Sequence, residues 1–240
     1  MRIRPVVNLH TANRFTIIGQ PLMIMGFSFV VIIIVGIIAN SVTSSASDLN
    51  DMYEGMRWNG AIFALLGPLM GFGIAAMAQY FPLATGLGLT RSEFARGTAL
   101  VFLGLAAIFT IVVTIGKTIE QATTGWGLHI RFFDVFYTGV GPAWQTLIQT
   151  FLVISAFMFI GAAATTMVNR WGQFSLWVVL ALFMVGGLCV VMGAILNTAF
   201  AEWLFSLLTM GWLPWMGVVL AIGVIGAAAW AILVRRAQAR

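Results

Sequence analysis

The chain has 240 residues, of which 61% are hydrophobic and 8% are charged, and its mean hydropathy is +1.02. Ordinary soluble domains contain roughly 25% charged residues, so this composition excludes a soluble fold. The formal net charge of +5 comes from scattered single arginines rather than a dense patch, which argues against nucleic acid as a partner. The one cysteine, Cys189, excludes a disulfide framework and a cysteine-based metal site within one chain.

The chain begins with a basic segment that precedes the first apolar run. Before Ile17, apolar residues such as Val6 and Leu9 alternate with polar ones such as Arg4 and His10. This mixture indicates either an interfacial helix on the inner leaflet or a disordered tail. The apolar run that follows exceeds the roughly 7–15 residues of a signal-peptide core, so we expect it to be retained as a membrane span.

Apolar runs of sufficient length to cross a membrane, about 20 residues, recur along the chain. Six stretches qualify: about Ile17–Asn40, Asn59–Phe81, Thr98–Ile115, Ala143–Val168, Phe174–Thr198 and Trp212–Val234. No repeat of fixed period and no low-complexity tract interrupts them. We therefore expect an all-α polytopic membrane protein with six transmembrane helices, in which residues 1–240 form a single domain and both termini lie on one side.

The distribution of Lys and Arg predicts which side this is, because cytoplasmic segments carry an excess of both. Nine of the twelve basic residues fall on the side of the termini: Arg2, Arg4, Arg14, Arg91, Arg96, Arg170, Arg235, Arg236 and Arg240. The other side holds Arg57, Lys117 and Arg131. Both termini are accordingly predicted to be cytoplasmic.

The first external loop is polar, whereas the second span contains several small residues. The loop, SVTSSASDLNDMYEGMRW, is polar and is expected to lack lasting structure, although an acidic rim that captures substrate is an alternative interpretation. The second span carries Gly67, Pro68, Gly71 and Gly73. These small residues predict a face on which another helix packs closely, or a bend.

A polar interruption, YFPLATGLGLTRSEFARGTAL, separates the second and third spans at residues 80–100. Thr90 followed by Glu93 has the spacing of a capping box, and Leu89 and Phe94 take the positions of a hydrophobic staple. We expect a short, capped cytoplasmic helix here. It would present Thr90, Arg91, Ser92, Glu93, Phe94 and Arg96.

The longest external segment covers residues 117–141. Its aromatic residues suit the membrane interface and predict an interfacial hairpin or short helix: Trp126, Phe132, Phe133, Phe136 and Tyr137. His129, Arg131 and Asp134 suggest either a catalytic cluster or a solvated polar face. The second is favoured because no nucleophile or second histidine lies nearby.

Two later features lie near the external side. Gln145 and Gln149 stand four residues apart, on one face of the fourth span, and predict hydrogen bonds between helices or contact with a water-filled path. The stretch NTAFAEWLFSLLTMGWLPW, residues 197–215, is too short to span twice and too apolar for a free loop. Two short helices that dip into the outer leaflet, as a re-entrant hairpin before the last span, would fit.

Residues for chemistry are scarce. The GLGLTR turn lacks the GK[ST] ending of a phosphate-binding loop, and His10 and His129 lie on opposite sides of the membrane. No paired carboxylates and no HExxH motif occur in a span, so no catalytic residues, metal site or cofactor are expected in this chain. The nearly uncharged interior also disfavours an ion-coupled carrier.

The order of these elements resembles the permease subunit of bacterial exporter-type ABC transporters whose ATPase is a separate polypeptide. Six spans, an N-terminal interfacial helix, a capped helix between spans two and three and a hairpin before span six carry the resemblance across the whole chain. The most specific part is LATGLGLTRSEFARGTAL, because a G-(V/L)-(T/S)-R-x-x-F segment after a proline-bearing span is similar to many such permeases. The very short turn at Arg170 and the lack of a large external domain depart from subfamilies that engage periplasmic partners.

The resemblance implies a location, partners and roles. The chain would lie in the bacterial inner membrane as a permease, paired with a second copy as a homodimer and with a cytosolic ATP-binding subunit that holds ATP and Mg. Thr90–Arg96 would be the coupling helix, with Phe94 in an apolar pocket of the ATPase and Arg91 and Arg96 against acidic groups. Gln145, Gln149 and Asn197 are candidates for the translocation path.

The expected cargo is a hydrophobic or amphipathic compound such as a drug, lipid or peptide, because the interior is apolar and uncharged. Efflux is the direction that the exporter resemblance favours. Two other functions stay open: a membrane scaffold or assembly factor without transport activity, and a secondary transporter driven by an ion gradient.

Overall fold

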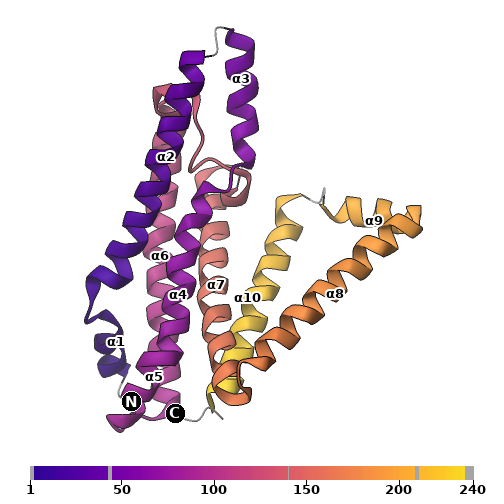
Figure 1. Cartoon of the computed structure of the whole chain (residues 1–240). Coiled ribbons are helices and arrows are strands. Elements are labelled where there is room, and N and C mark those ends of the chain that lie inside the picture. Colours follow the sequence, from indigo (N-terminus) through magenta and orange to yellow (C-terminus); the bar gives the residue numbers. More distant parts are fainter. Residues whose placement is uncertain (1–2, 43–44, 140, 209–210, 236–240) are drawn as a thin grey trace.

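The structure is a computed structural model of the whole chain, and it describes residues 3–42, 45–139, 141–208 and 211–235. The described residues form helices joined by turns and by one long loop between α6 and α7, with no strand among them (Figure 1). The helices, in chain order, are α1 Ile3–Thr11, α2 Gln20–Val42, α3 Ala46–Gly55, α4 Leu66–Ala75, α5 Phe81–Gly86, α6 Arg91–Ala122, α7 Ala143–Trp171, α8 Phe174–Leu196, α9 Thr198–Leu208 and α10 Trp212–Arg235.

Six helical segments are long and apolar enough to cross a membrane, which confirms the predicted all-α polytopic architecture. They are Phe15–Val42, Ser47–Gly86, Arg91–Ala122, Ala143–Trp171, Phe174–Leu196 and Trp212–Arg235. The first begins with the π-helical turn η1, Phe15–Gly19, and the second contains a 3-10 turn, η3 at Ala61–Leu65, and a π-helical turn, η4 at Ala76–Tyr80. We call the end of the bundle with α1 and the α5–α6 junction the α1 end, and the opposite end the α3 end.

The bundle is built around α7, which packs against α4, α6 and α10 (Figure 1). Two glycines let the backbones of α4 and α7 approach closely. A Cβ added at Gly73 of α4 would lie 2.2 Å from the carbonyl oxygen of Met158, and a Cβ added at Gly161 of α7 would lie 2.6 Å from the carbonyl oxygen of Met70. Small residues at helix contacts are a common basis of packing in membranes. The predicted close-packing face of the second span is therefore present at Gly73, whereas a Cβ at Gly67 or Gly71 meets open space.

Helix α1 is docked on the bundle, so the alternative of a disordered tail is wrong. Val6 is fully buried, and a Cβ added at Gly97 of α6 would lie 2.6 Å from its Cβ. His10, also fully buried, lies with its Nε2 2.9 Å from the Thr98 hydroxyl. The helix therefore packs into the first turns of α6.

Helices α8 and α9 project away from the other helices (Figure 1). No residue of α8 is buried, although most of them are apolar. In the described residues α9 is one helix, and the second half of the predicted re-entrant hairpin is instead the first turn of α10, which begins at Trp212. The hairpin of two short helices is thus wrong in its second member.

Both long segments predicted to be external differ from expectation: the first is more ordered, and the second is not the predicted hairpin or short helix. The polar segment after the first span contains α3. In the segment 117–141, α6 continues to Ala122, and residues 123–139 form a largely irregular loop in which Phe132 and Phe133 are buried. These rings pack inside the protein rather than at a membrane interface.

Candidate functional site

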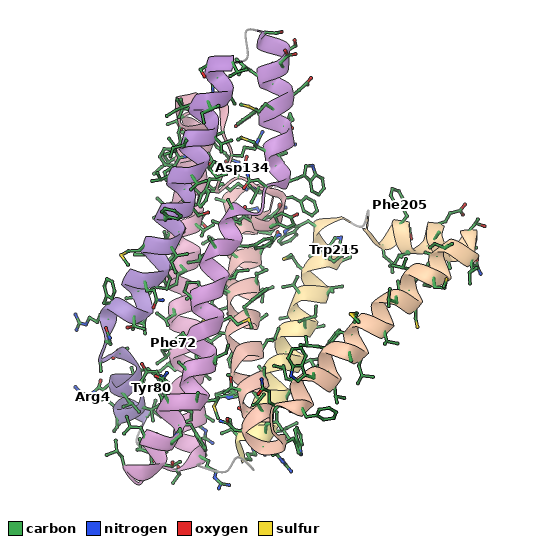
Figure 2. All side chains as sticks on the ribbon, viewed as in Figure 1. Arg4, Phe72, Tyr80, Asp134, Phe205 and Trp215 are labelled. Carbon is green, nitrogen blue, oxygen red and sulfur yellow. The ribbon has the colours of Figure 1, made fainter. Side chains whose placement is uncertain are left out.

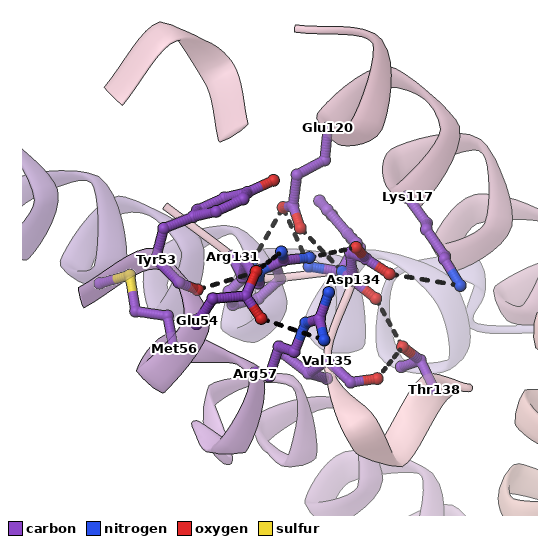
Figure 3. A network of polar contacts seen from close by, with 12 residues as sticks. Tyr53, Glu54, Met56, Arg57, Lys117, Glu120, Arg131, Asp134, Val135 and Thr138 are labelled. Atoms are coloured by element: carbon purple, nitrogen blue, oxygen red, sulfur yellow. Dashed lines mark hydrogen bonds and ion pairs between the residues drawn. The ribbon is translucent and has the colours of Figure 1, made fainter. Parts of the chain in front are cut away.

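A network of buried charged side chains holds the α3 end together, and it begins at Glu120 in the last turn of α6 (Figure 3). Glu120 is fully buried, and one carboxylate oxygen accepts the backbone N–H of Asp134 at 2.7 Å. The other accepts the N–H groups of Phe132 and Phe133 at 2.9 and 3.0 Å and the Trp126 indole N–H at 3.0 Å. One carboxylate therefore satisfies three consecutive backbone donors of a buried loop, which would otherwise be costly to desolvate.

Lys117 lies one turn earlier on α6 and reaches the other end of the same loop. Its ammonium donates to the carbonyl oxygens of Gly139 and Gly141, the second at 2.9 Å, and to the Thr146 hydroxyl at 3.0 Å. The Asp134 carboxylate lies 3.3 Å away. Lys117 is buried and thereby joins α6, the loop and the start of α7.

Arg131 joins this loop to α3. Its guanidinium donates to the Asp134 carboxylate, to that of Glu54 at 2.9 Å and, through Nε, to the Tyr53 carbonyl at 3.0 Å. It also lies 3.8 Å from the centre of the Tyr53 ring, a cation–π contact. Glu54 in turn pairs with Arg57 at 3.0 Å.

The charges in the network compensate one another. The buried members are two cations, Lys117 and Arg131, and two carboxylates, Glu120 and Asp134. Buried charges persist when they are paired and hydrogen-bonded, because an unpaired one is expensive to desolvate. With its ionisable side chains engaged in this way, the network acts as a clamp between α3, α6, α7 and the loop.

The expectation of a solvated face at Arg131 and Asp134 is therefore wrong, and sequence reasoning missed the roles of Lys117 and Glu120. Lys117 and Glu120 are three residues apart in the sequence, as are Arg131 and Asp134. The available signal was the position of Lys117 and Glu120 on the same helical face, at the end of a long apolar run and next to an aromatic-rich loop. His129 stands apart from these ion pairs, with its ring 6.2 Å from that of Tyr53.

The predicted capping box at the α1 end is present. The Thr90 hydroxyl accepts the Glu93 N–H at 3.3 Å, and the Glu93 carboxylate accepts the Thr90 N–H at 3.1 Å. The helix that starts there is, however, the full-length α6, so Thr90–Arg96 is the beginning of the third span and not a separate short helix.

Phe94 is buried within the bundle, whereas the resemblance implies an exposed side chain that contacts a partner. Its side chain is fully buried, with ring centres 5.2 Å from Phe81 and 5.7 Å from His10. It anchors α6 to α5 and α1, so an exposed Phe94 that fills a partner's pocket is wrong for this structure. The exposed side chains here are Thr90, Arg91, Ser92 and Arg96, with Leu83 and Leu87 on the preceding helix and turn.

The three residues proposed for a path are not brought together within one chain. Gln149 accepts the Trp212 indole N–H at 3.0 Å and donates to the Tyr137 carbonyl at 2.9 Å, so it joins α7 to α10 and the loop. Asn197 lies between α8 and α9, where its side chain accepts the Phe200 N–H at 3.1 Å, in the part of the chain that projects from the bundle (Figure 1). Gln145 is partly exposed near the start of α7. A role for any of them in translocation stays a prediction.

Comparison of the chain with known proteins adds no relative. No protein-family model, no curated protein and no solved structure matches it.

Proposed function

We propose that the chain is the membrane subunit of an ATP-driven transporter of the ABC exporter type, and that it works with a cytosolic ATPase. The observation that carries the proposal is the continuity of α6. This helix has 32 residues and runs without a break from an exposed, capped start at one end of the bundle to the buried charges at the other. At 1.5 Å per residue it is about 48 Å long, so it can carry a displacement across a membrane.

The start of α6 offers a contact surface that suits a partner protein. We define this docking surface as Leu83, Leu87, Arg91, Ser92 and Arg96. Leu83 and Leu87 are 51% and 66% exposed, and Arg91, which is also exposed, follows a few residues later in the chain. Leucines flanked by arginines favour a partner groove that is apolar at its centre and acidic at its rim.

Movement of this surface would be transmitted to other helices. Arg91 donates to the Arg235 carbonyl at 3.0 Å, which joins the start of α6 to the end of α10. Val6, His10 and Phe94 lock α1 onto the same turns. A partner that pulls on the docking surface would therefore move α1, α6 and α10 together, and α6 would act on the clamp at the α3 end.

The proposal also gives the orientation of the chain in the membrane and its pairing with a second copy. The α1 end faces the cytoplasm of a bacterium, as the excess of arginines predicts. A second copy of the chain is the proposed partner of α8 and α9, because these apolar helices make few contacts within their own chain. A Cβ at Gly186 or Gly187 of α8 meets open space, so another helix can approach there.

The test is co-expression of the chain with its neighbouring genes, purification, and detection of an ATPase subunit in the complex, followed by measurement of ATPase turnover in vesicles. Leu87→Asp and Arg91→Glu are expected to reduce co-purification at least tenfold. Leu87→Met keeps the side chain apolar, and Arg14→Glu makes the same charge change at an exposed position on the same side. Both controls should bind as the native chain does.

Two results would overturn the proposal. The first is a purified native complex that contains no ATPase. The second is an ATPase that co-purifies but whose turnover is unchanged by the docking variants and by added amphipathic compounds, which would indicate a scaffold.

A further inference from the structure

A cleft opens between the first two spans, near the α1 end. Its volume is about 480 Å³. The residues that matter for its chemistry come from both spans: Thr16, Gln20, Gly67, Gly71, Gln79 and Tyr80. Phe72 and Tyr80 lie at the level of α1 (Figure 2), where both rings contact His10, with ring centres 5.5 and 4.7 Å apart.

Both walls of the cleft are built on irregular helix. Thr16 belongs to the π-helical turn η1, with Gln20 directly after it, and Gln79 and Tyr80 belong to η4. Single π-helical turns are rare and occur frequently at functional sites, because the wider turn redirects side chains. Two such turns, one in each span, place four polar side chains around one cleft.

These four polar groups have no hydrogen-bond partner in the described part of the chain. This holds for the amides of Gln20 and Gln79 and for the hydroxyls of Thr16 and Tyr80. Polar groups at membrane depth are costly unless they are bonded, so side chains of this kind usually face another helix, a water-filled path or a ligand. All four residues line the cleft, and Thr16, Gln20 and Gln79 are exposed there.

Their depth indicates which part of a ligand they would meet. Gln20 lies five residues from the start of the first span and Gln79 seven from the end of the second, which at 1.5 Å per residue is about 8 and 10 Å. Both residues therefore lie nearer to the α1 end of these spans than to their middles. Beyond them the cleft continues past Gly67 and Gly71, and no charged side chain lines it.

We propose that this cleft binds an amphipathic molecule that moves in sideways from the adjacent lipid leaflet. Its uncharged polar part, an ester, amide or hydroxyl group, bonds to Gln20, Gln79, Thr16 and Tyr80. Its apolar chain lies along Gly67 and Gly71. The role of this molecule as cargo rests on the proposed function, whereas its binding does not.

The test uses a monoacylglycerol that carries a photoreactive group in its acyl chain, added to the full chain in phospholipid vesicles without an ATPase. Saturable labelling is expected within residues 16–24 and 67–80, and unlabelled monoacylglycerol should compete with it. A photoreactive fatty acid with the same chain, whose head is a carboxylate, should label these segments at least fivefold less.

Matched leucine substitutions locate the site. Gly67→Leu and Gly71→Leu add side chains to open space, so they fill the cleft without forcing the helices apart, and labelling should fall at least fivefold. Gly26→Leu on α2 also meets open space and does not line the cleft, so it should label as the native chain does. Gln20→Leu with Gln79→Leu should remove the preference for the neutral head. Thermal unfolding of each variant checks that the fold is kept.

The proposal would be overturned if Gly67→Leu and Gly71→Leu were both labelled as strongly as the native chain, or if the label appeared outside residues 16–24 and 67–80. It would also be overturned if unlabelled monoacylglycerol did not reduce the labelling, because this would indicate contact with bulk lipid. If labelling succeeds but no ATPase co-purifies, the proposed function fails and the binding site stands. If the ATPase responds to Arg91→Glu but the cleft is not labelled, the binding site fails alone.

Discussion

The Glu120 carboxylate accepts the backbone N–H of Asp134 at 2.7 Å, and this bond ties the last turn of α6 to the loop that reaches α3 and α7. Because the same carboxylate also accepts two further backbone donors, Glu120→Ala would leave three buried N–H groups and two cations undercompensated. We expect a loss of about 3–5 kcal/mol in stability, the range for breaking a buried charge network.

Thermal unfolding in detergent measures this loss. Glu120→Gln keeps one acceptor oxygen and should lose less than Glu120→Ala. Glu202→Ala, at an exposed position on α9, is the control and should leave the melting temperature unchanged. Equal melting temperatures for the Glu120 and Glu202 variants would contradict a clamp at the α3 end.

Close packing of α4 on α7 leads to a second prediction. Gly73→Ala would place a methyl group 2.2 Å from the Met158 carbonyl oxygen, and a backbone atom cannot rotate away. The helices must separate, at a cost of about 1–3 kcal/mol. Gly104→Ala on α6 meets open space and should not destabilise the protein, so a comparison of the two in detergent denaturation separates overpacking from a general effect of alanine.

The docking of α1 should depend on pH through His10, which lies outside the spans. Burial lowers the pKa of His10 from 6.5 to about 4. When α1 is released, the imidazole regains a pKa near 6.5, so between pH 6.5 and 4 the released state binds more protons and is favoured. Docking is fully present above pH 6.5 and weakens by about 1.4 kcal/mol for each pH unit below it, levelling off below pH 4.

Hydrogen exchange of the α1 amides at pH 7.5 and 5, corrected for the intrinsic rate, measures this effect. The native chain should lose about tenfold or more in protection at the lower pH. His129→Asn should behave in the same way, because asparagine also tolerates the left-handed backbone at this position, with φ of 52°. His10→Phe should abolish the pH dependence, and its persistence in that variant would show that another group controls α1.

The proposed homodimer predicts a periodic pattern of cross-links on α8. Cys189 is the only cysteine in the chain and is exposed, so single cysteines can be moved along α8 in a Cys189→Ser background. Oxidation in vesicles should produce dimers at positions that repeat every three to four residues, the period of one helical face. A scan in which no position cross-links, or all do so equally, would argue that lipid alone covers α8.

Local sequence patterns determined much of the architecture. The six spans follow from runs of apolar residues, since a membrane helix satisfies its backbone hydrogen bonds within itself and needs no knowledge of its neighbours. The start of α6 likewise follows from Thr90 and Glu93, because a capping box acts over three residues. The small residues of the second span predict close packing at Gly67, Gly71 and Gly73 alike, and only Gly73 meets the backbone of another helix.

The tertiary structure alone decided what the polar and aromatic side chains do. Lys117, Glu120, Arg131 and Asp134 read as external charges along the chain, and only the folding of the loop onto α6 buries and pairs them. Phe94 looks exposed beside two arginines until α1 and α5 cover it. Gln20 and Gln79 lie 59 positions apart in the sequence, and only the packing of the first two spans brings them to one cleft. Such long-range contacts depend on how helices pack in space, which no local pattern encodes.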